Sequence, residues 1–104
     1  SACRYPDGPN YVRAYRAVAA AIRRHDPRIL LFADTDGGFP RKIATGMGDP
    51  AVAALVDAYV VHTIGAPSEE VRAVHAKIVA ELPPRPWFQN EYEYLTGGAN
   101  RSAA

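Results

Sequence analysis

The sequence predicts an α/β domain in which parallel strands alternate with helices along all 104 residues. Three short apolar runs end in polar residues, which is typical of strands buried on both faces of a parallel sheet. Segments with apolar residues at i, i+3 and i+4 spacing separate the runs and predict helices. The runs recur at intervals of roughly 28 to 30 residues, about the length of one strand–helix unit. This order implies parallel strands joined by right-handed crossovers.

The first expected element is a helix over residues 11–25, with Asn10 as its N-cap. Apolar residues at helical spacing form one face of it: Val12, Tyr15, Val18, Ala19 and Ile22. The basic residues 23–25 suit the negative end of the helix dipole. Pro27 ends the helix because the residue before a proline is pushed out of the helical region.

A first strand is expected over residues 28–33, followed directly by Asp34. Residues 39–48 contain Pro and Gly and are expected to form a loop. Asp49, which precedes a proline, predicts the N-cap of a short helix over residues 50–56.

The second strand is expected over residues 58–62 and closes with His62. Ser68 is the expected N-cap of the next helix, which ends at the prolines 83–84. The apolar stripe of this helix consists of Val71, Val74, His75, Ile78 and Leu82. The third strand is expected over residues 86–90.

Three strands are few for the two architectures that this order allows, a β/α barrel and an open doubly wound sheet. A complete barrel takes about 250 residues, and an isolated parallel sheet leaves two edges bare. Residues 1–4 carry neither an initiator Met nor a signal-peptide pattern. We therefore expect residues 1–104 to form an incomplete part of a β/α (TIM) barrel. The bare edges of the sheet would be covered by the remaining barrel segments or by self-association.

Composition and charge exclude several classes of protein. The chain is 48% hydrophobic and 22% charged, which indicates a globular domain. The formal net charge is +1 and Lys and Arg form no basic block, so we expect no nucleic-acid partner. No apolar run approaches the roughly 18 residues of a membrane span. The single cysteine, Cys3, excludes an internal disulfide and leaves the compartment open.

Candidate functional residues lie where the expected strands end. Function in parallel α/β folds gathers at the carboxyl ends of strands. The first strand ends in Asp34, the second in His62, and the third in Asn90 and Glu91. All three strands therefore deliver polar side chains to the same rim of the sheet.

Glu91 is the sharpest candidate because it directly follows an apolar strand and precedes Tyr92. Aromatic rings stack on apolar sugar faces, and a carboxylate can attack or stabilise an oxocarbenium-like centre. Two alternatives stay open for Glu91: a solvated side chain, or an ion pair with Arg85 or Arg101. His62 is either a ligand-positioning donor or a partly buried histidine bonded at the strand end.

No metal or cofactor is expected. Residues 34–37 superficially resemble a calcium loop, but no Glu stands at its twelfth position. The sequence has no phosphate-cradling glycine pattern, no zinc-ligand spacing and no Gly-x-Ser-x-Gly elbow.

Three stretches resemble, in the right order, part of the clan A (β/α)8-barrel glycoside hydrolases. YVRAYRAVAAAIRRHDP at residues 11–27 is similar to the helix after strand four of that family. DAYVVH at residues 57–62 resembles strand six, where an Asp precedes the strand and a His closes it. RPWFQNEY at residues 85–92 resembles strand seven, where a Pro leads into the nucleophilic Glu and an aromatic residue. The resemblance covers nearly the whole chain, and the order of these motifs carries most of its weight.

The resemblance implies part of a retaining glycoside hydrolase that acts on a carbohydrate. Glu91 would be the nucleophile, with Glu93 as the rival for that role. The substrate-binding residues would be His62, Asp34, Trp87, Asn90 and Tyr92.

One departure from the family matters. The family's acid/base Glu lies at the end of strand four in an Asn-Glu-Pro-like motif, which would fall before Ser1. Retaining hydrolysis needs two carboxylates about 5–5.5 Å apart, so this chain alone is expected to be inactive. Two other functions stay open. One is a non-catalytic carbohydrate-binding or degenerate barrel relative, and the other is an α/β ligand-binding or interaction domain whose Glu91 is structural.

Overall fold

The core of the protein is a three-stranded parallel sheet in the order β1-β2-β3. The computed structural model describes residues 7–34, 38–64 and 67–93, of which 63–64 and 90–93 are described by their backbone alone. The strands are β1 (Phe32–Ala33), β2 (Ala58–Ile64) and β3 (Trp87–Glu93). The predicted α/β class with parallel strands is thus confirmed.

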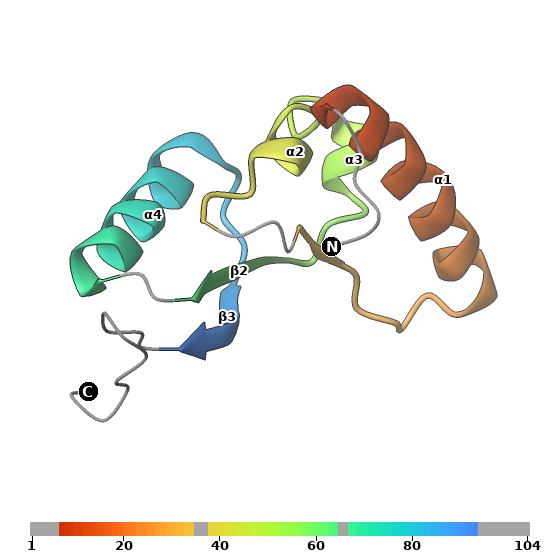
Figure 1. The fold of residues 1–104 in the computed structure, drawn as a ribbon. Coiled ribbons are helices and arrows are strands. Elements are labelled where there is room, and N and C mark those ends of the chain that lie inside the picture. Colours follow the sequence, from red (N-terminus) through yellow and green to blue (C-terminus); the bar gives the residue numbers. More distant parts are fainter. Residues whose placement is uncertain (1–6, 35–37, 65–66, 94–104) are drawn as a thin grey trace.

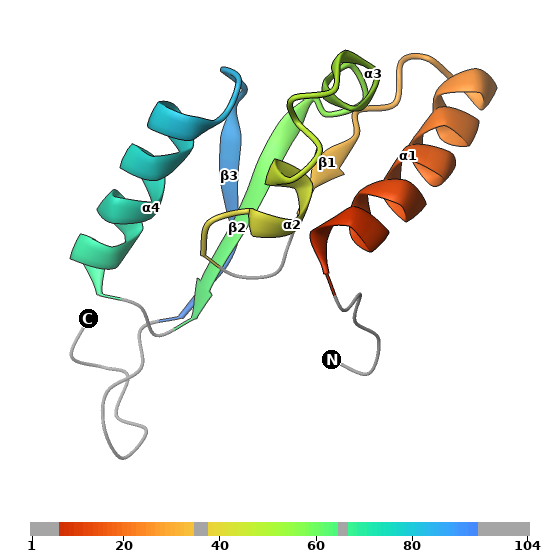
Figure 2. The ribbon, with the colours of Figure 1, turned by 90° about the horizontal axis from the view of Figure 1, so that it is seen from above.

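Four helices cover one face of this sheet. They are α1 (Gly8–His25), α2 (Arg41–Ala44), α3 (Pro50–Ala53) and α4 (Ser68–Glu81). Figure 1 shows all four on the same side of the strands, and Figure 2 shows α2 and α3 between α4 and α1. The core between helices and sheet contains Ala33, Ile43, Met47, Val52, Val56, Tyr59, Val61 and Ile78.

The other face of the sheet is apolar and open. Phe32 on β1 and Phe88 on β3 are 44% and 49% exposed, and their rings stack with centroids 5.5 Å apart. The two strands flank β2 and lie roughly 10 Å apart at the usual strand spacing. The rings therefore lean toward each other over the middle strand. Beneath them Ala58 and Val60 are only 2% and 4% exposed.

The helix α1 begins earlier than the sequence predicts. Asp7, not Asn10, is its N-cap, since Asp7 Oδ1 accepts the Asn10 backbone N–H at 2.8 Å. A proline in the first turn is tolerated there because its missing N–H would have no partner inside the helix. The predicted end at His25 is confirmed.

Close backbone contact joins α1 to the turn that follows α2. A Cβ on Gly8 would lie 2.4 Å from Thr45 Cγ2, and a Cβ on Gly46 would lie 2.6 Å from Val12 Cγ1. Only glycine leaves room for this approach. The helix α1 therefore packs closely against the segment that contains the core residues Ile43 and Met47.

The strand β1 is shorter than the predicted span 28–33, because only Phe32 and Ala33 pair with β2. The residue before them is nevertheless held, since Leu31 O accepts the Asp57 N–H at 2.8 Å. Further back, Ile29 and Leu30 are 41% and 68% exposed. Among the described strands, β1 lies at the edge of the sheet, beside β2.

Other boundaries also differ from the predictions. The strand β2 ends at Ile64 rather than at His62, and β3 spans Trp87–Glu93 rather than residues 86–90. The expected loop 39–48 contains the short helix α2, and α3 ends at Ala53 rather than at residue 56. The predicted cap of α3 is confirmed, since Asp49 Oδ1 accepts the Ala51 N–H at 2.9 Å. Ser68 is the first residue of α4 rather than its cap, a place taken by Pro67.

Candidate functional site

The register of β2 and β3 brings two of the predicted site residues together. Val61 pairs with Gln89, but the next pair is His62 with Glu91, so Asn90 is an extra residue on β3. Without this one-residue shift, Asn90 would be the partner of His62. Bulges of this kind re-aim residues near the ends of strands and are frequent next to active sites.

His62 lies near the carboxyl end of β2. Its side chain is half-buried, and the preceding Val61 is fully buried in the core on the helix side. Because successive residues of a strand alternate between faces, His62 belongs to the open face of the sheet. This is the face that carries the stacked rings of Phe32 and Phe88.

Glu91 and its neighbours are placed by their backbone. Asn90, Glu91, Tyr92 and Glu93 all belong to β3, in which Tyr92 pairs with Thr63 and Glu93 pairs with Ile64. Their side chains lie outside the described part of the structure. Cross-strand partners share a face of a sheet, so the register puts the position of Glu91 on the same face as His62.

Asp34 is not brought to the open face. It is 3% exposed, and its Oδ2 accepts the backbone N–H of Ile43 at 2.8 Å. Ile43 belongs to α2 and is fully buried in the core on the helix side of the sheet. This hydrogen bond ties the end of β1 to α2 and gives Asp34 a structural contact, while its expected contact with substrate stays a prediction.

Trp87 also lies apart from His62 and Glu91. It is the first residue of β3, four positions before Glu91 and thus roughly 13 Å away along an extended strand. Its ring packs against the core and stands 5.4 Å from the ring of His75 on α4. Trp87 therefore packs between α4 and the sheet, and its expected contact with substrate stays a prediction.

Polar contacts at the amino ends of the strands serve the fold. Asp57 Oδ2 accepts from Leu31 N at 2.8 Å and from Arg23 Nη2 at 2.9 Å. The hydroxyl of Tyr59 donates to Pro83 O at 2.6 Å, and burial raises the pKa of this phenol.

Arg85 also makes hydrogen bonds that stabilise the fold at the amino ends of the strands. Its guanidinium donates to Val56 O at 2.8 Å and to Ala53 O at 3.2 Å, both at the carboxyl end of α3. These bonds hold it near the start of β3, so the described contacts give no support to an ion pair with Glu91. The other suggested partner, Arg101, lies outside the described residues.

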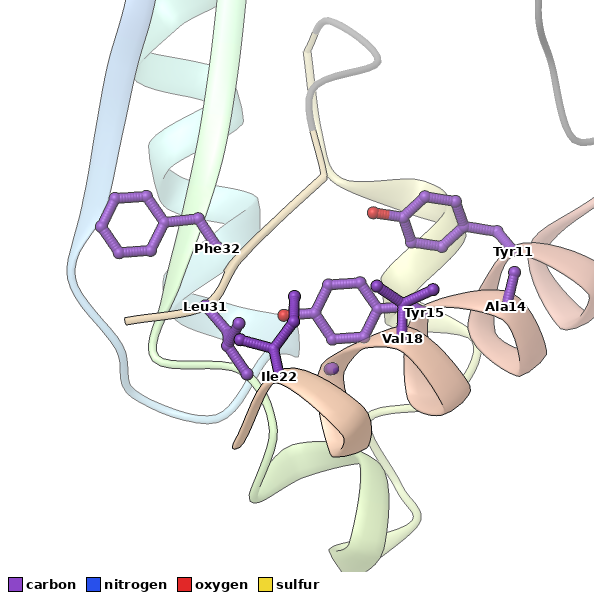
Figure 3. A pocket seen from close by; sticks show the side chains of 8 residues that line it. Tyr11, Ala14, Tyr15, Val18, Ile22, Leu31 and Phe32 are labelled. Carbon is purple, nitrogen blue, oxygen red and sulfur yellow. The ribbon is translucent and has the colours of Figure 1, made fainter. Parts of the chain in front are cut away.

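An apolar groove between α1 and β1 was not foreseen from the sequence. Figure 3 shows the side chains that line it, and its volume is about 270 Å³. Val18, expected in the core, is 60% exposed here. The hydroxyl of Tyr15 donates to Leu55 O at 2.8 Å, and burial, reinforced by the charge of Asp57, raises its pKa to about 12. Among the described residues that line the groove there is no carboxylate or imidazole.

The described residues contain neither a cluster of metal ligands nor a helix that could span a membrane. No group of three or more His, Cys, Asp or Glu side chains within 7–34, 38–64 and 67–93 is arranged to hold a metal ion. Among the helices in these ranges, none is both long and apolar enough to cross a membrane.

Comparison with known proteins identifies no relative. No protein-family model matches the chain, and searches of curated proteins and of solved structures found no match either.

Proposed function

We propose that the chain is the strand-five to strand-seven portion of a (β/α)-barrel glycoside hydrolase that cleaves O-glycosidic bonds with retention. In this assignment Glu91 is the nucleophile and His62 binds or orients the sugar. The observation that carries the proposal is the shifted register, which makes Glu91 the partner of His62 near the carboxyl ends of adjacent strands. Parallel β/α folds gather their chemistry at that edge.

The arrangement of the helices supports a barrel segment over an open doubly wound sheet. The strands follow each other in chain order, and all four described helices pack on one face. Barrels keep their crossover helices outside, whereas doubly wound sheets carry helices on both faces. The open face with Phe32 and Phe88 would then line the barrel interior, which bulky side chains fill in layers.

The proposed reaction follows the two-carboxylate scheme of retaining enzymes. The carboxylate of Glu91 attacks the anomeric carbon while a second carboxylic acid protonates the departing oxygen. The glycosyl ester that forms is then hydrolysed by water, which the second group deprotonates. Two inversions at the same carbon give net retention. The second carboxylate comes, in this proposal, from a segment outside the 104 residues, so the chain alone should not turn over substrate.

The experiment compares Glu91→Gln with Glu93→Gln in the protein that carries this chain together with its remaining barrel strands. Glutamine keeps the shape of glutamate but cannot attack, so Glu91→Gln should lower turnover on the order of 10⁴-fold or more. Glu93→Gln is the matched control and should retain most of the activity. Azide added to the shorter variant Glu91→Ala, which leaves room for the anion, should restore turnover and yield a product of inverted configuration.

Three outcomes decide between the possibilities. Azide rescue of Glu93→Ala instead would move the nucleophile by two positions and keep the mechanism. A fluorinated mechanism-based glycoside should label the peptide that contains Glu91. Near-native rates of both variants, with the label on another segment, would disprove the assignment of β3 as the nucleophile strand.

A further inference from the structure

We draw no further inference here: the strongest candidate, the open apolar face of the sheet around the stacked rings of Phe32 and Phe88 together with the adjoining groove between α1 and β1, is an unpartnered surface, and nothing in the described residues shows what covers it.

Discussion

Asp57 connects three parts of the chain through one carboxylate. It bonds the last turn of α1 through Arg23 and the approach to β1 through Leu31, and it stands directly before β2. A backbone N–H that is bonded to a carboxylate needs no strand partner, so the pairing of β1 with β2 can begin as late as Phe32. The Asp before the strand, one of the features that resembles a hydrolase motif, therefore has a structural explanation in this chain.

Replacing His62 tests the proposed site most directly. If His62 donates a hydrogen bond to the sugar, His62→Ala should lower kcat/KM by about 10- to 100-fold, the range for a bond to a polar or charged group. The melting temperature should hardly change, since the half-buried ring lies near the carboxyl end of β2 and outside the core between helices and sheet. Activity assays and thermal unfolding of the protein with its complete barrel measure both quantities. A large drop in melting temperature, with unchanged activity per folded molecule, would instead make His62 a packing residue.

Tyr15 predicts a loss of stability at alkaline pH. Its pKa is raised from 10.0 to about 12, first by burial and then by the charge of Asp57. An unfolded tyrosine loses its proton near pH 10 while the folded one keeps it. Loss of the proton therefore stabilises the unfolded state relative to the folded state as the pH rises. The contribution is fully present below pH 10 and should be lost between pH 10 and 12. Allowing for partial solvent screening, the free energy of unfolding should fall by about 1–2 kcal/mol.

Urea unfolding at pH 9, 10 and 11 measures this effect, and Tyr15→Phe is the control. The phenylalanine variant should show a shallower decline in stability over the same interval, although it also loses the bond to Leu55 O. An equal decline in both proteins would show that other groups cause it.

At the scale of elements, the contact between α1 and the turn after α2 depends on Gly46. The nearest atoms to a new Cβ at this position would be the two methyl carbons of Val12, at 2.6 and 2.9 Å. Valine is stiff about χ1 and cannot simply swing away. We expect Gly46→Ala to lower the free energy of unfolding by about 1–3 kcal/mol, the usual effect of overpacking.

Gly48 provides the matched control for Gly46. It lies two residues further on, a Cβ added there would meet no atom within 4 Å, and its backbone is outside the left-handed region. Gly48→Ala should therefore be neutral or stabilise by less than about 1 kcal/mol, through the reduced entropy of the unfolded chain. Urea unfolding compares the two variants. Similar losses in both would mean that α1 moves freely away from the turn.

Long periodic elements were predictable from the sequence, whereas short ones depend on tertiary contacts. The stripes of α1 and α4 and the apolar run of β2 carry their own signal, and these elements are present. The four-residue helix α2 is too short to carry such a signal. Its backbone is held by the buried carboxylate of Asp34 at the end of β1, and this tertiary contact is not visible in the sequence. The early start of α1 was missed because Asp7 and Asn10 are both good caps, and only the observed hydrogen bond distinguishes them.

The candidate site was predictable only as a set of strand ends. Sequence alone gives the order of His62 and Glu91 along the chain but not the one-residue shift that aligns them, because a bulge is a property of the paired strands. Sequence alone also does not show that the Asp34 carboxylate bonds the backbone of the helix layer, because this contact depends on how α2 packs on the sheet. Trp87 was expected among the substrate-binding residues, and the extended strand places its backbone at the opposite end of β3 from Glu91.

At the scale of the whole molecule, the open face of the sheet predicts self-association of the isolated 104-residue chain. Phe32 and Phe88 are about half exposed, and the sheet has two edge strands. Exposed apolar patches and bare edges favour contact with further protein. Sedimentation velocity should therefore show an average mass that rises with protein concentration.

Two lysine variants test whether self-association occurs through the open face or through any exposed apolar residue. Phe88→Lys puts a charge on the open face and should reduce association. Val79→Lys changes an apolar residue on α4 that is more exposed, at 68% against 49%, and should not. A compact monomer with cooperative unfolding at every concentration would contradict the proposed incompleteness of the sheet. Equal reduction by both variants would mean that association does not involve the open face.

The bonds of Asp57, Tyr59 and Arg85 all lie at the amino ends of the strands, away from His62 and the position of Glu91. Inherited substitutions at one end of the sheet should therefore have little effect on the bonds at the other. A lineage could exchange the residue at position 62 and still inherit a chain that folds. Descendants with different substrates would then share an amino end that changes slowly and a carboxyl edge that diverges, and new activity could arise without a compensating mutation in the core.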